Sequence, residues 1–314
     1  MPFGFPSGQL LKDLICEKLR KGYPEQSPNL RDFLLQIGFK EGYIEDFRQS
    51  LLCSPISSVD VFLEHSPDFK DVGKVAISRE LLDTEGEFRL FAYWQSKRLA
   101  KWKGDEPVLY RGDHIDDDNW YQLLFARLNT PFDDFEKNNI CIITFNYDRS
   151  LEHYLFTGLR RTYNRTIDEC AEKLKAINII HVHGSLGPLP WQQSDNAVPY
   201  EGSATIERVK VANQNIKIIP EANTKTYEFD LAFEELKSAK EIYFLGFGYH
   251  ETNMTRLRLR ELPGGSEVYG TTYGLSAQDI YRLQNLGLGY MRPQYNRFVD
   301  ERVYQFLIKM AVFH

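Results

Sequence analysis

Two short stretches of this sequence place polar side chains directly after apolar runs. In CIITFNYDRSLE (141–152) the apolar run ends in a polar cluster that contains Thr144, Asn146 and Asp148. In INIIHVHGSLG (177–187) the apolar run is followed by His183, Gly184 and Ser185. An imidazole can take up a proton near neutral pH, and an amide both donates and accepts hydrogen bonds. Side chains of these types can activate a water molecule and orient a hydroxyl group.

A third stretch of the same kind, EIYFLGFGYHETN (241–253), contains Gly246, Phe247 and Gly248 after its apolar run. In an open parallel sheet, ligands bind outside the carboxyl ends of the strands, where loops diverge and helix N-termini point their free N–H groups outward. If the three runs are parallel strands, we expect the polar residues to meet at one rim of the sheet.

The texture of the sequence after residue 130 supports such a sheet. Short apolar runs at 139–145, 177–182, 216–220, 241–247 and 266–274 alternate with segments of helical periodicity. Strands separated by helices imply right-handed crossovers and a parallel sheet covered on both faces. We therefore predict an α/β fold class.

The first part of the chain is different, because it contains mostly amphipathic segments. A helix over 8–21 with Ser7 as its N-cap is expected, and residues 29–129 contain no convincing strand. We predict a sheet domain made of residues 1–28 and 130–314, with 29–129 as a large helical insertion module. Residues 186–213 are expected to form a long loop over the ligand edge, with a short strand near ERVKVAN (207–213).

Composition narrows the class of protein. The 314 residues are 42% hydrophobic and 14% aromatic, which is typical of a globular protein with a real core. The net charge of -6 gives no general attraction for nucleic acid or anionic lipid. With no apolar run long enough to span a membrane, a cytoplasmic protein is expected. The four cysteines (16, 53, 141 and 170) are isolated, so we predict neither a disulfide framework nor a thiolate zinc site, and no metal is assigned.

Each polar segment also has a purely structural explanation. Asn146 or Asp148 can cap a helix that begins near Ser150. His183 can be an ordinary structural histidine, and Gly246 with Gly248 can simply permit a tight strand-to-helix turn. The occurrence of all three segments at predicted strand ends favours the functional reading.

The full spelling ITFNYDRSLE, HVHGSLG and YFLGFGYHETN resembles the sirtuin-like NAD-binding family. It resembles the bacterial sirtuin-like domains that hydrolyse NAD in antiphage defence more closely than it resembles protein deacylases. The resemblance extends to GFPSGQLL (4–11), SVDVFLEH (58–65) and GKVAISRELL (73–82), so it covers most of the chain. It implies a Rossmann-like sheet and NAD as the substrate.

The resemblance also implies roles for individual residues. His183 would be the general base or the group that activates the ribose, and Asn146 would orient the ribose hydroxyls or the water. Asp148 would contact the nicotinamide amide unless it caps the helix, and Phe5 would cover nicotinamide unless it is a hydrophobic staple for the first helix. The remaining residues expected near NAD are Thr144, Gly184, Ser185, Gly246, Phe247 and Gly248.

Two departures from the family qualify what it implies. Deacylating sirtuins carry a four-cysteine zinc ribbon, which isolated cysteines cannot build, so a protein deacylase or ADP-ribosyl transferase is disfavoured. The strand and glycine-rich phosphate loop that precede GFPSG in the family have no counterpart here, where only three residues precede Gly4. A start codon placed too far downstream, a shortened chain and a domain without the loop are all open explanations.

Two functions from different classes follow. The first is an NAD hydrolase that releases nicotinamide and ADP-ribose, in antiphage defence. The alternative is a catalytically silent nucleotide-binding or assembly module of the same fold. Either would act as a homo-oligomer or with a partner defence protein, with no membrane and no direct nucleic-acid binding expected.

Overall fold

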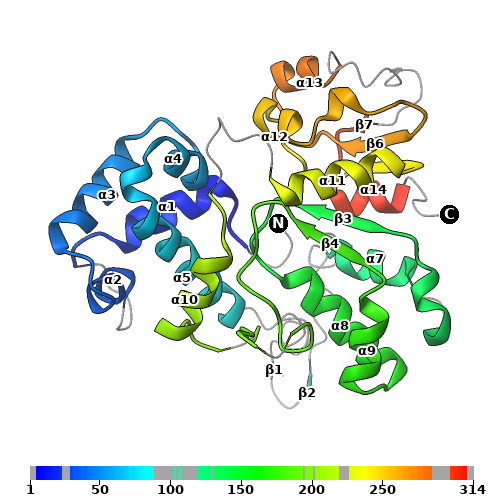
Figure 1. The fold of residues 1–314 in the computed structure, drawn as a ribbon, viewed down its shortest axis with the longest axis horizontal. Helices are drawn as coiled ribbons and strands as arrows, with labels where there is room; N and C mark the ends of the chain where they lie inside the picture. The colour runs from blue at the N-terminus through cyan, green and yellow to red at the C-terminus, as the bar shows by residue number, and fades with distance from the viewer. Residues whose placement is uncertain are drawn as a thin grey trace. The chain divides into compact units, whose positions relative to one another are not determined.

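The protein is divided into two compact units, each built from separate stretches of the chain (Figure 1). The first unit takes Met1–Arg111, Phe145–Ala171 and His183–Pro220, and the second takes Gly112–Thr144, Glu172–Val182 and Glu221–His314. The structure is a computed structural model that describes residues 5–22, 29–87, 102–103, 106–107, 119–128, 131–193, 195–200, 202–218, 226–284 and 298–309.

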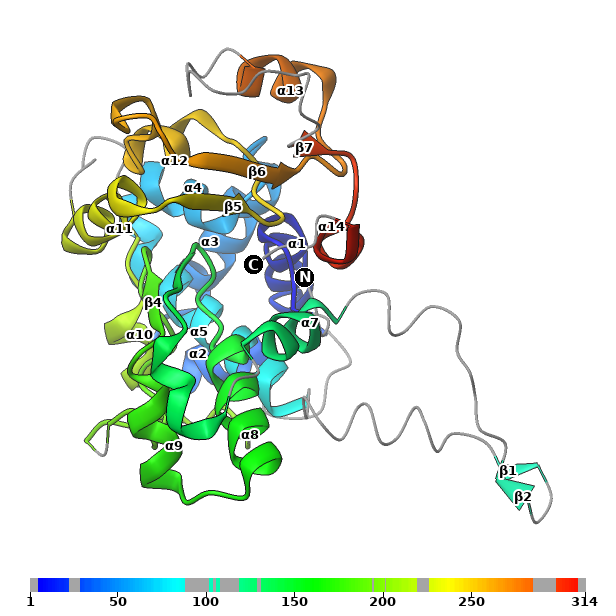
Figure 2. The ribbon, with the colours of Figure 1, turned by 90° about the vertical axis from the view of Figure 1, so that its right-hand side faces the viewer.

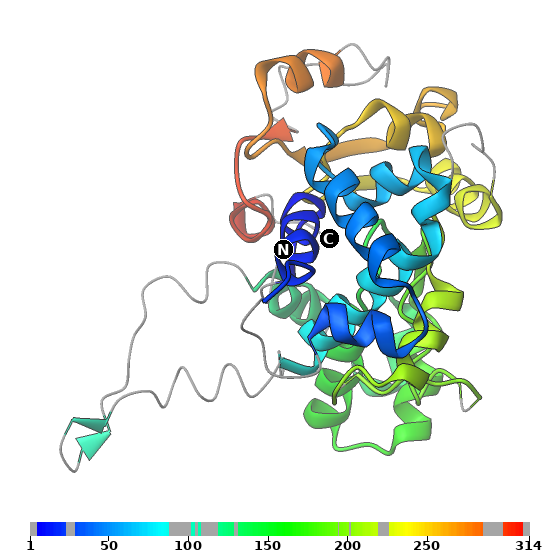
Figure 3. The same ribbon diagram turned by 90° about the vertical axis from the view of Figure 1, so that its left-hand side faces the viewer.

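The first unit is mainly helical. Its helices are α1 (Gly8–Lys18), α2 (Leu30–Gln36), α3 (Glu41–Cys53), α4 (Val59–His65), α5 (Lys70–Glu87), α8 (Ser150–Tyr163) and α10 (Ile206–Asn215), with the short 3-10 helix η2 (Pro67–Phe69). Figure 3 shows α1 to α5, in blue and cyan, lying against one another. A pair of two-residue strands, β1 (Trp102–Lys103) and β2 (Glu106–Pro107), is antiparallel.

Local sequence explains where these helices begin. Ser7 accepts a hydrogen bond from the N–H of Leu10 at 3.3 Å, so the predicted N-cap of α1 is confirmed. Leu11, Ile15 and Leu19 follow at intervals of four residues and are all buried. α1 therefore presents one apolar stripe to the rest of the unit.

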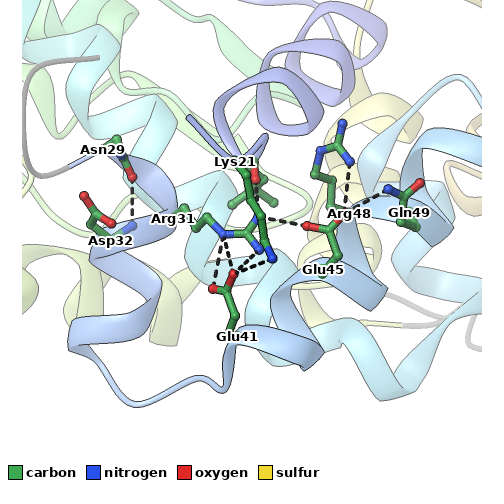
Figure 4. A network of polar contacts seen from close by, with 9 residues as sticks. Lys21, Asn29, Arg31, Asp32, Glu41, Glu45, Arg48 and Gln49 are labelled. Atoms are coloured by element: carbon green, nitrogen blue, oxygen red, sulfur yellow. Dashed lines mark hydrogen bonds and ion pairs between the residues drawn. The ribbon is translucent and has the colours of Figure 1, made fainter. Parts of the chain in front are cut away.

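A network of charged side chains around Arg31 joins the ends of α1, α2 and α3 (Figure 4). The guanidinium of Arg31 is buried, and it donates to the carbonyl of Leu19 at the end of α1. It also donates to both carboxylate oxygens of Glu41 and, at 2.9 Å, to Glu45 on α3. The hydrogen bonds from Arg31 lower the pKa of Glu41. One arginine thus links three helices.

The second unit contains the parallel strands. Its elements are α7 (Trp120–Arg127), η4 (Phe132–Lys137), β3 (Cys141–Thr144), β4 (Asn178–His181), α11 (Tyr227–Ser238), β5 (Glu241–Phe244), α12 (Glu251–Arg256), η5 (Leu259–Glu261), β6 (Glu267–Thr271), α13 (Ala277–Gln284), β7 (Phe298–Val299) and α14 (Val303–Lys309). The residues of α9 (Ile167–Leu174) are divided between the units. Together with the helices, these strands make the protein α/β.

The strands of the second unit form two parallel sheets among the described residues. β3 pairs with β4, and β6 lies between β5 and β7 (Figure 2). On one face of the second sheet the rings of Tyr243 and Tyr269 are stacked, with centroids 5.0 Å apart. These two rings lie over Phe306 and Leu307 of α14, which are buried. α14 therefore covers this face of the sheet.

Two predictions for residues 207–220 are wrong. ERVKVAN belongs to helix α10 rather than a strand, because Thr205 caps its start and Val209 and Ala212 turn to one buried side. Of the strand expected over 216–220, residues 216–218 are not in a strand, although the N–H of Lys217 donates to the carbonyl of His183 at 2.8 Å. This backbone hydrogen bond connects Lys217 to His183, but a single bond does not make the segment a β-strand. Residues 219–220 lie outside the described residues.

The remaining predictions on organisation have mixed outcomes. The strands expected within 139–145, 177–182, 241–247 and 266–274 are confirmed. A block without strands over 29–129 is wrong in one detail, the pair β1–β2. The division into a sheet domain and a helical insertion stays a prediction. No helix within the described ranges has the length and apolar character to cross a membrane.

The Arg31 network leads to a first testable prediction. Arg31→Ala removes charge-assisted hydrogen bonds, one of them to a buried carbonyl, and we expect it to lower the free energy of unfolding by roughly 2–3 kcal/mol. Arg20→Ala is the matched control, because Arg20 pairs with Glu17 only at the surface. Urea denaturation of the two variants measures the difference, and equal midpoints would contradict the role given to Arg31.

Candidate functional site

The first two predicted site segments begin where β3 and β4 end. The strands are parallel and in step, with Thr144 opposite His181, and the N–H of Val182 donates to the carbonyl of Thr144 at 3.1 Å. Asn146 and His183 each lie two residues beyond this last pair. Both segments therefore leave their strands at the same level.

Two aromatic rings face the imidazole of His183. Its centroid lies 5.6 Å from that of Phe145, with the planes at 56°, and 6.4 Å from that of Tyr147, with the planes at 61°. Asn146 is the residue between these two in the chain. Phe145, Asn146 and His183 are partly exposed and Tyr147 is buried. The structure thus brings together the two segments that carry the predicted catalytic residues.

Two backbone hydrogen bonds and one side-chain hydrogen bond connect this group to other segments of the first unit. The N–H of Leu186 donates to the carbonyl of Tyr147 at 3.0 Å, which ties the second segment to the first. The carbonyl of His183 accepts from Lys217, as described above. The hydroxyl of Tyr147 donates to Asp60 of α4 at 2.9 Å. The two turns that carry the predicted catalytic residues are therefore bonded to each other, to the segment after α10 and to α4.

Asp148 has a structural task at the start of α8. Its carboxylate is buried and accepts from the N–H of Ser150 at 3.1 Å and from the Ser150 hydroxyl. The residue at the N-cap, Arg149, makes no side-chain cap. These bonds favour the helix-capping alternative for Asp148. The predicted contact with the nicotinamide amide stays a prediction.

Gly184 and Ser185 form a tight turn against α10. Gly184 has φ +74°, and a Cβ atom there would overlap the carbonyl oxygen of Asn215, the last residue of α10. Ser185 accepts from the N–H of Gly187 at 3.3 Å. The glycine is explained by this close approach of two backbones. A further role beside NAD stays a prediction for both residues.

Phe5 lies just before α1 in the first unit and is 4% exposed. It stands two residues before the N-cap Ser7. Its burial fits a packing role at the start of the helix. Its predicted role as a cover for nicotinamide stays a prediction.

Sequence reasoning missed the buried ion pair between Glu85 and Arg149. The guanidinium of Arg149 donates to both carboxylate oxygens of Glu85, and the side chains are 1% and 0% exposed. Arg149 also donates to the carbonyls of Gly187 at 3.1 Å and Val198 at 2.6 Å. Burial, the larger effect, raises the pKa of Glu85, and Arg149 opposes that rise. Sequence patterns gave no signal for this pair, because its two members lie 64 residues apart in the chain.

The other predicted cofactor residues belong to the second unit. Thr144 is the last residue of β3. After β5, Gly246 has φ +63° and donates its N–H to the hydroxyl of Thr271 at 2.9 Å. Phe247 lies edge-on to Tyr249 with centroids 5.0 Å apart, and Gly248 follows it in an ordinary conformation. The predicted turn after this strand is present, and its role toward NAD stays a prediction.

Tyr249 is an unforeseen feature of this turn. It is buried with φ +49°, and its hydroxyl donates to the carbonyl of Thr271 at 3.3 Å. Burial raises the pKa of this hydroxyl. Gly270 in β6 lies so close that a Cβ atom there would overlap the Tyr249 hydroxyl. The turn after β5 is therefore packed against β6 and hydrogen-bonded to it.

The described residues hold no evident metal-binding cluster, and burial keeps two of the four thiols protonated. No three side chains of His, Cys, Asp or Glu gather there in a way that could hold a metal ion. Burial raises the pKa of the Cys16 thiol to about 11 and that of Cys141 to about 12. Both thiols are therefore protonated at neutral pH and are poor nucleophiles.

Comparison with known proteins adds no constraint on this site. No family model, no curated protein and no solved structure matches the chain. Functional assignment therefore depends on the chemistry of the residues themselves, above all the group around His183.

The turn at Gly184 predicts a specific cost of substitution. We expect Gly184→Ala to cost more than the roughly 1–2 kcal/mol of a left-handed alanine, because the new Cβ would also collide with a backbone carbonyl. Gly274→Ala is the control, since Gly274 has φ +77° and open space around it. Urea unfolding compares them, and equal losses of stability would show that the approach to Asn215 is looser than described.

Another histidine of the first unit, His153, is partly buried and is not among the predicted site residues. His153 of α8 is stacked on Tyr200, with centroids 4.1 Å apart and planes at 2°. Burial, with a smaller contribution from Arg149, lowers the pKa of His153 to about 4. His153 is therefore neutral in the folded protein over the physiological pH range.

The lowered pKa of His153 makes stability depend on pH. Because the unfolded chain binds the proton more tightly, the contribution of His153 is complete above about pH 6.5 and is lost as the pH falls toward 4. We expect a loss of about 2 kcal/mol between pH 7 and pH 5. His153→Gln should remove this part of the pH dependence in urea titrations. The exposed-site control His65→Gln should retain it, and a wild-type-like slope in His153→Gln would refute the assignment.

Proposed function

We propose that the protein is an NAD hydrolase that cleaves the bond between nicotinamide and ribose and releases nicotinamide and ADP-ribose. Its α/β fold is, on this proposal, a Rossmann-like fold of the sirtuin-like, zinc-free class. The observation that carries the proposal is the contact of the His183 imidazole with Phe145 and Tyr147, the residues on either side of Asn146. It supports a site with one base and one amide at the ends of parallel strands.

The chemistry suits these two side chains. Cleavage of the nicotinamide–ribose bond builds positive charge on the sugar, in an oxocarbenium-like transition state similar to that of glycoside hydrolysis. A neutral imidazole at His183 accepts a proton from the attacking water or from a ribose hydroxyl. Asn146 orients the ribose hydroxyls or the water with its donor and acceptor atoms. The two residues together supply the base and the positioning group.

The proposal extends to the residues expected to hold the rest of NAD. Gly184 and Ser185 lie in the turn beside His183 in the first unit, and Gly246, Phe247 and Gly248 follow β5 in the second. Phe5, Thr144 and Asp148 complete the set by resemblance alone. Among these residues, Asp148 and Gly184 have structural tasks that explain their identity without NAD.

The proposed biological setting is bacterial antiphage defence. An NAD-consuming enzyme depletes the cell that makes it, so it has to stay silent until infection. We propose that a homo-oligomer or a partner defence protein controls it in the cytoplasm. The net charge of -6 supports the absence of a direct nucleic-acid partner.

Replacement of His183 tests the proposed function directly. We expect His183→Ala to lower nicotinamide release from NAD by at least about 100-fold, the usual scale for loss of a general base, with NAD binding retained. Chromatography of nicotinamide and ADP-ribose measures turnover, and calorimetry measures binding. His65→Ala is the control, because His65 is exposed at the end of α4.

The same measurements decide between the two functions. Wild-type protein that binds NAD but releases no nicotinamide, even with candidate defence partners present, would favour the silent nucleotide-binding module. Wild-type protein that neither binds nor cleaves NAD would contradict both.

A further inference from the structure

Asp60 connects the helical part of the first unit to the group around His183. It lies on α4, 87 residues before Tyr147, and its Oδ1 accepts a hydrogen bond from the Tyr147 hydroxyl at 2.9 Å. Its Oδ2 accepts from the hydroxyl of Ser58 at 3.2 Å. Ser58 stands at the N-cap of α4 but makes no side-chain cap. Both oxygens of the carboxylate are thus engaged, and Ser58 serves Asp60 rather than the helix.

The charge of Asp60 is costly where it lies. Burial, the largest effect, raises the pKa of this carboxyl, and the bonds from Tyr147 and Ser58 only partly offset that rise. The two hydroxyl donors offset part of the cost of burying this carboxylate, so Asp60 is tied to the Tyr147 hydroxyl by a hydrogen bond that either a carboxylate or an amide oxygen could accept.

The contact continues from Asp60 through Tyr147 to the imidazole. Tyr147 has its carbonyl held by Leu186, and His183 has its carbonyl held by Lys217, so both backbones are fixed independently. These backbone bonds do not set the directions of the Tyr147 and His183 side chains, which depend on side-chain contacts. The Tyr147 ring is tethered at its far end by Asp60 and faces the His183 ring. Phe145 faces the same ring.

We propose that Asp60 is a positioning residue, which holds the Tyr147 hydroxyl and thereby keeps the Tyr147 ring at the angle that orients the His183 imidazole. Without the tether, the tyrosine ring can swing about its first side-chain torsion, and His183 loses one of the two rings that face it. The consequence for catalysis rests on the proposed function. The contacts from Asp60 to Tyr147 and from Tyr147 to His183 do not depend on that function.

Three variants separate the tether from the ring. Tyr147→Phe keeps the ring and removes the hydroxyl, and Asp60→Ala removes the acceptor. Asp60→Asn is the conservative variant, because its amide can accept from Tyr147 and donate to Ser58. Asp46→Asn on α3 is the control, since Asp46 is exposed.

Steady-state kinetics with NAD is the first readout. We expect Tyr147→Phe and Asp60→Ala each to lower kcat about tenfold with KM nearly unchanged, a loss comparable to one hydrogen bond. The double variant should be no worse than either single one, and Asp60→Asn should recover most of kcat. Additive losses, or no loss in Tyr147→Phe, would overturn the proposal. Tyr147→Phe changes one oxygen atom, so it keeps the test valid if Asp60→Ala does not fold.

The second readout needs no turnover. In nitrogen-15 NMR spectra, the imidazole signals of His183 should shift in Tyr147→Phe and Asp60→Ala, and stay in place in Asp60→Asn and Asp46→Asn. If these shifts occur while the wild type does not cleave NAD, the positioning role holds and the proposed function fails. If the wild type cleaves NAD while kcat and the imidazole signals are unchanged in every variant, the positioning role is refuted.

Discussion

The buried ion pair between Glu85 and Arg149 is the interaction on which the first unit depends most. It joins α5 to the turn that follows β3, and Arg149 extends the connection to the carbonyls of Gly187 and Val198. Removing either partner of such a pair leaves a buried charge without compensation, at about 3–5 kcal/mol. The turn before α8 is held by this pair, and the residues that face His183 lie in that turn.

The site is assembled on turns whose own polar groups are largely satisfied. Asp148 caps α8, Ser185 accepts from a neighbouring N–H, and Gly184 allows α10 to approach. Supporting hydrogen bonds and packing of this kind restrict the positions that the side chains on these turns can take. The chemical part of the proposal therefore depends on His183 and Asn146 rather than on the whole set of predicted residues.

Much of the local structure could be predicted from the sequence, because it depends on neighbours along the chain. Ser7 as a helix cap and the strand ending at Thr144 are examples, since capping and apolar runs are local signals. The short strand predicted near 207–213 is wrong because valines in a polar helix resemble a short strand until packing selects one face.

The contacts that organise the site could not be found in this way. The sequence predicts amphipathic helices around Glu85 and Asp60, and on such a helix a carboxylate is ordinarily a solvated residue. Only the tertiary fold turns them toward Arg149 and Tyr147, which lie 64 and 87 residues further along the chain. A single sequence carries no mark of such long-range partners. Their importance follows from burial, which appears only when the helices are packed.

The turn after β5 has a consequence for how this protein can vary over generations. Tyr249 fills the space that a side chain at Gly270 would need, and its backbone adopts a conformation that is uncommon for tyrosine. A larger residue at 270 would need smaller side chains at Tyr249 and also at Phe298, whose ring lies nearly as close to the added Cβ atom. The three positions are therefore expected to co-vary in descendants of this sequence, with glycine at 270 inherited together with the two rings.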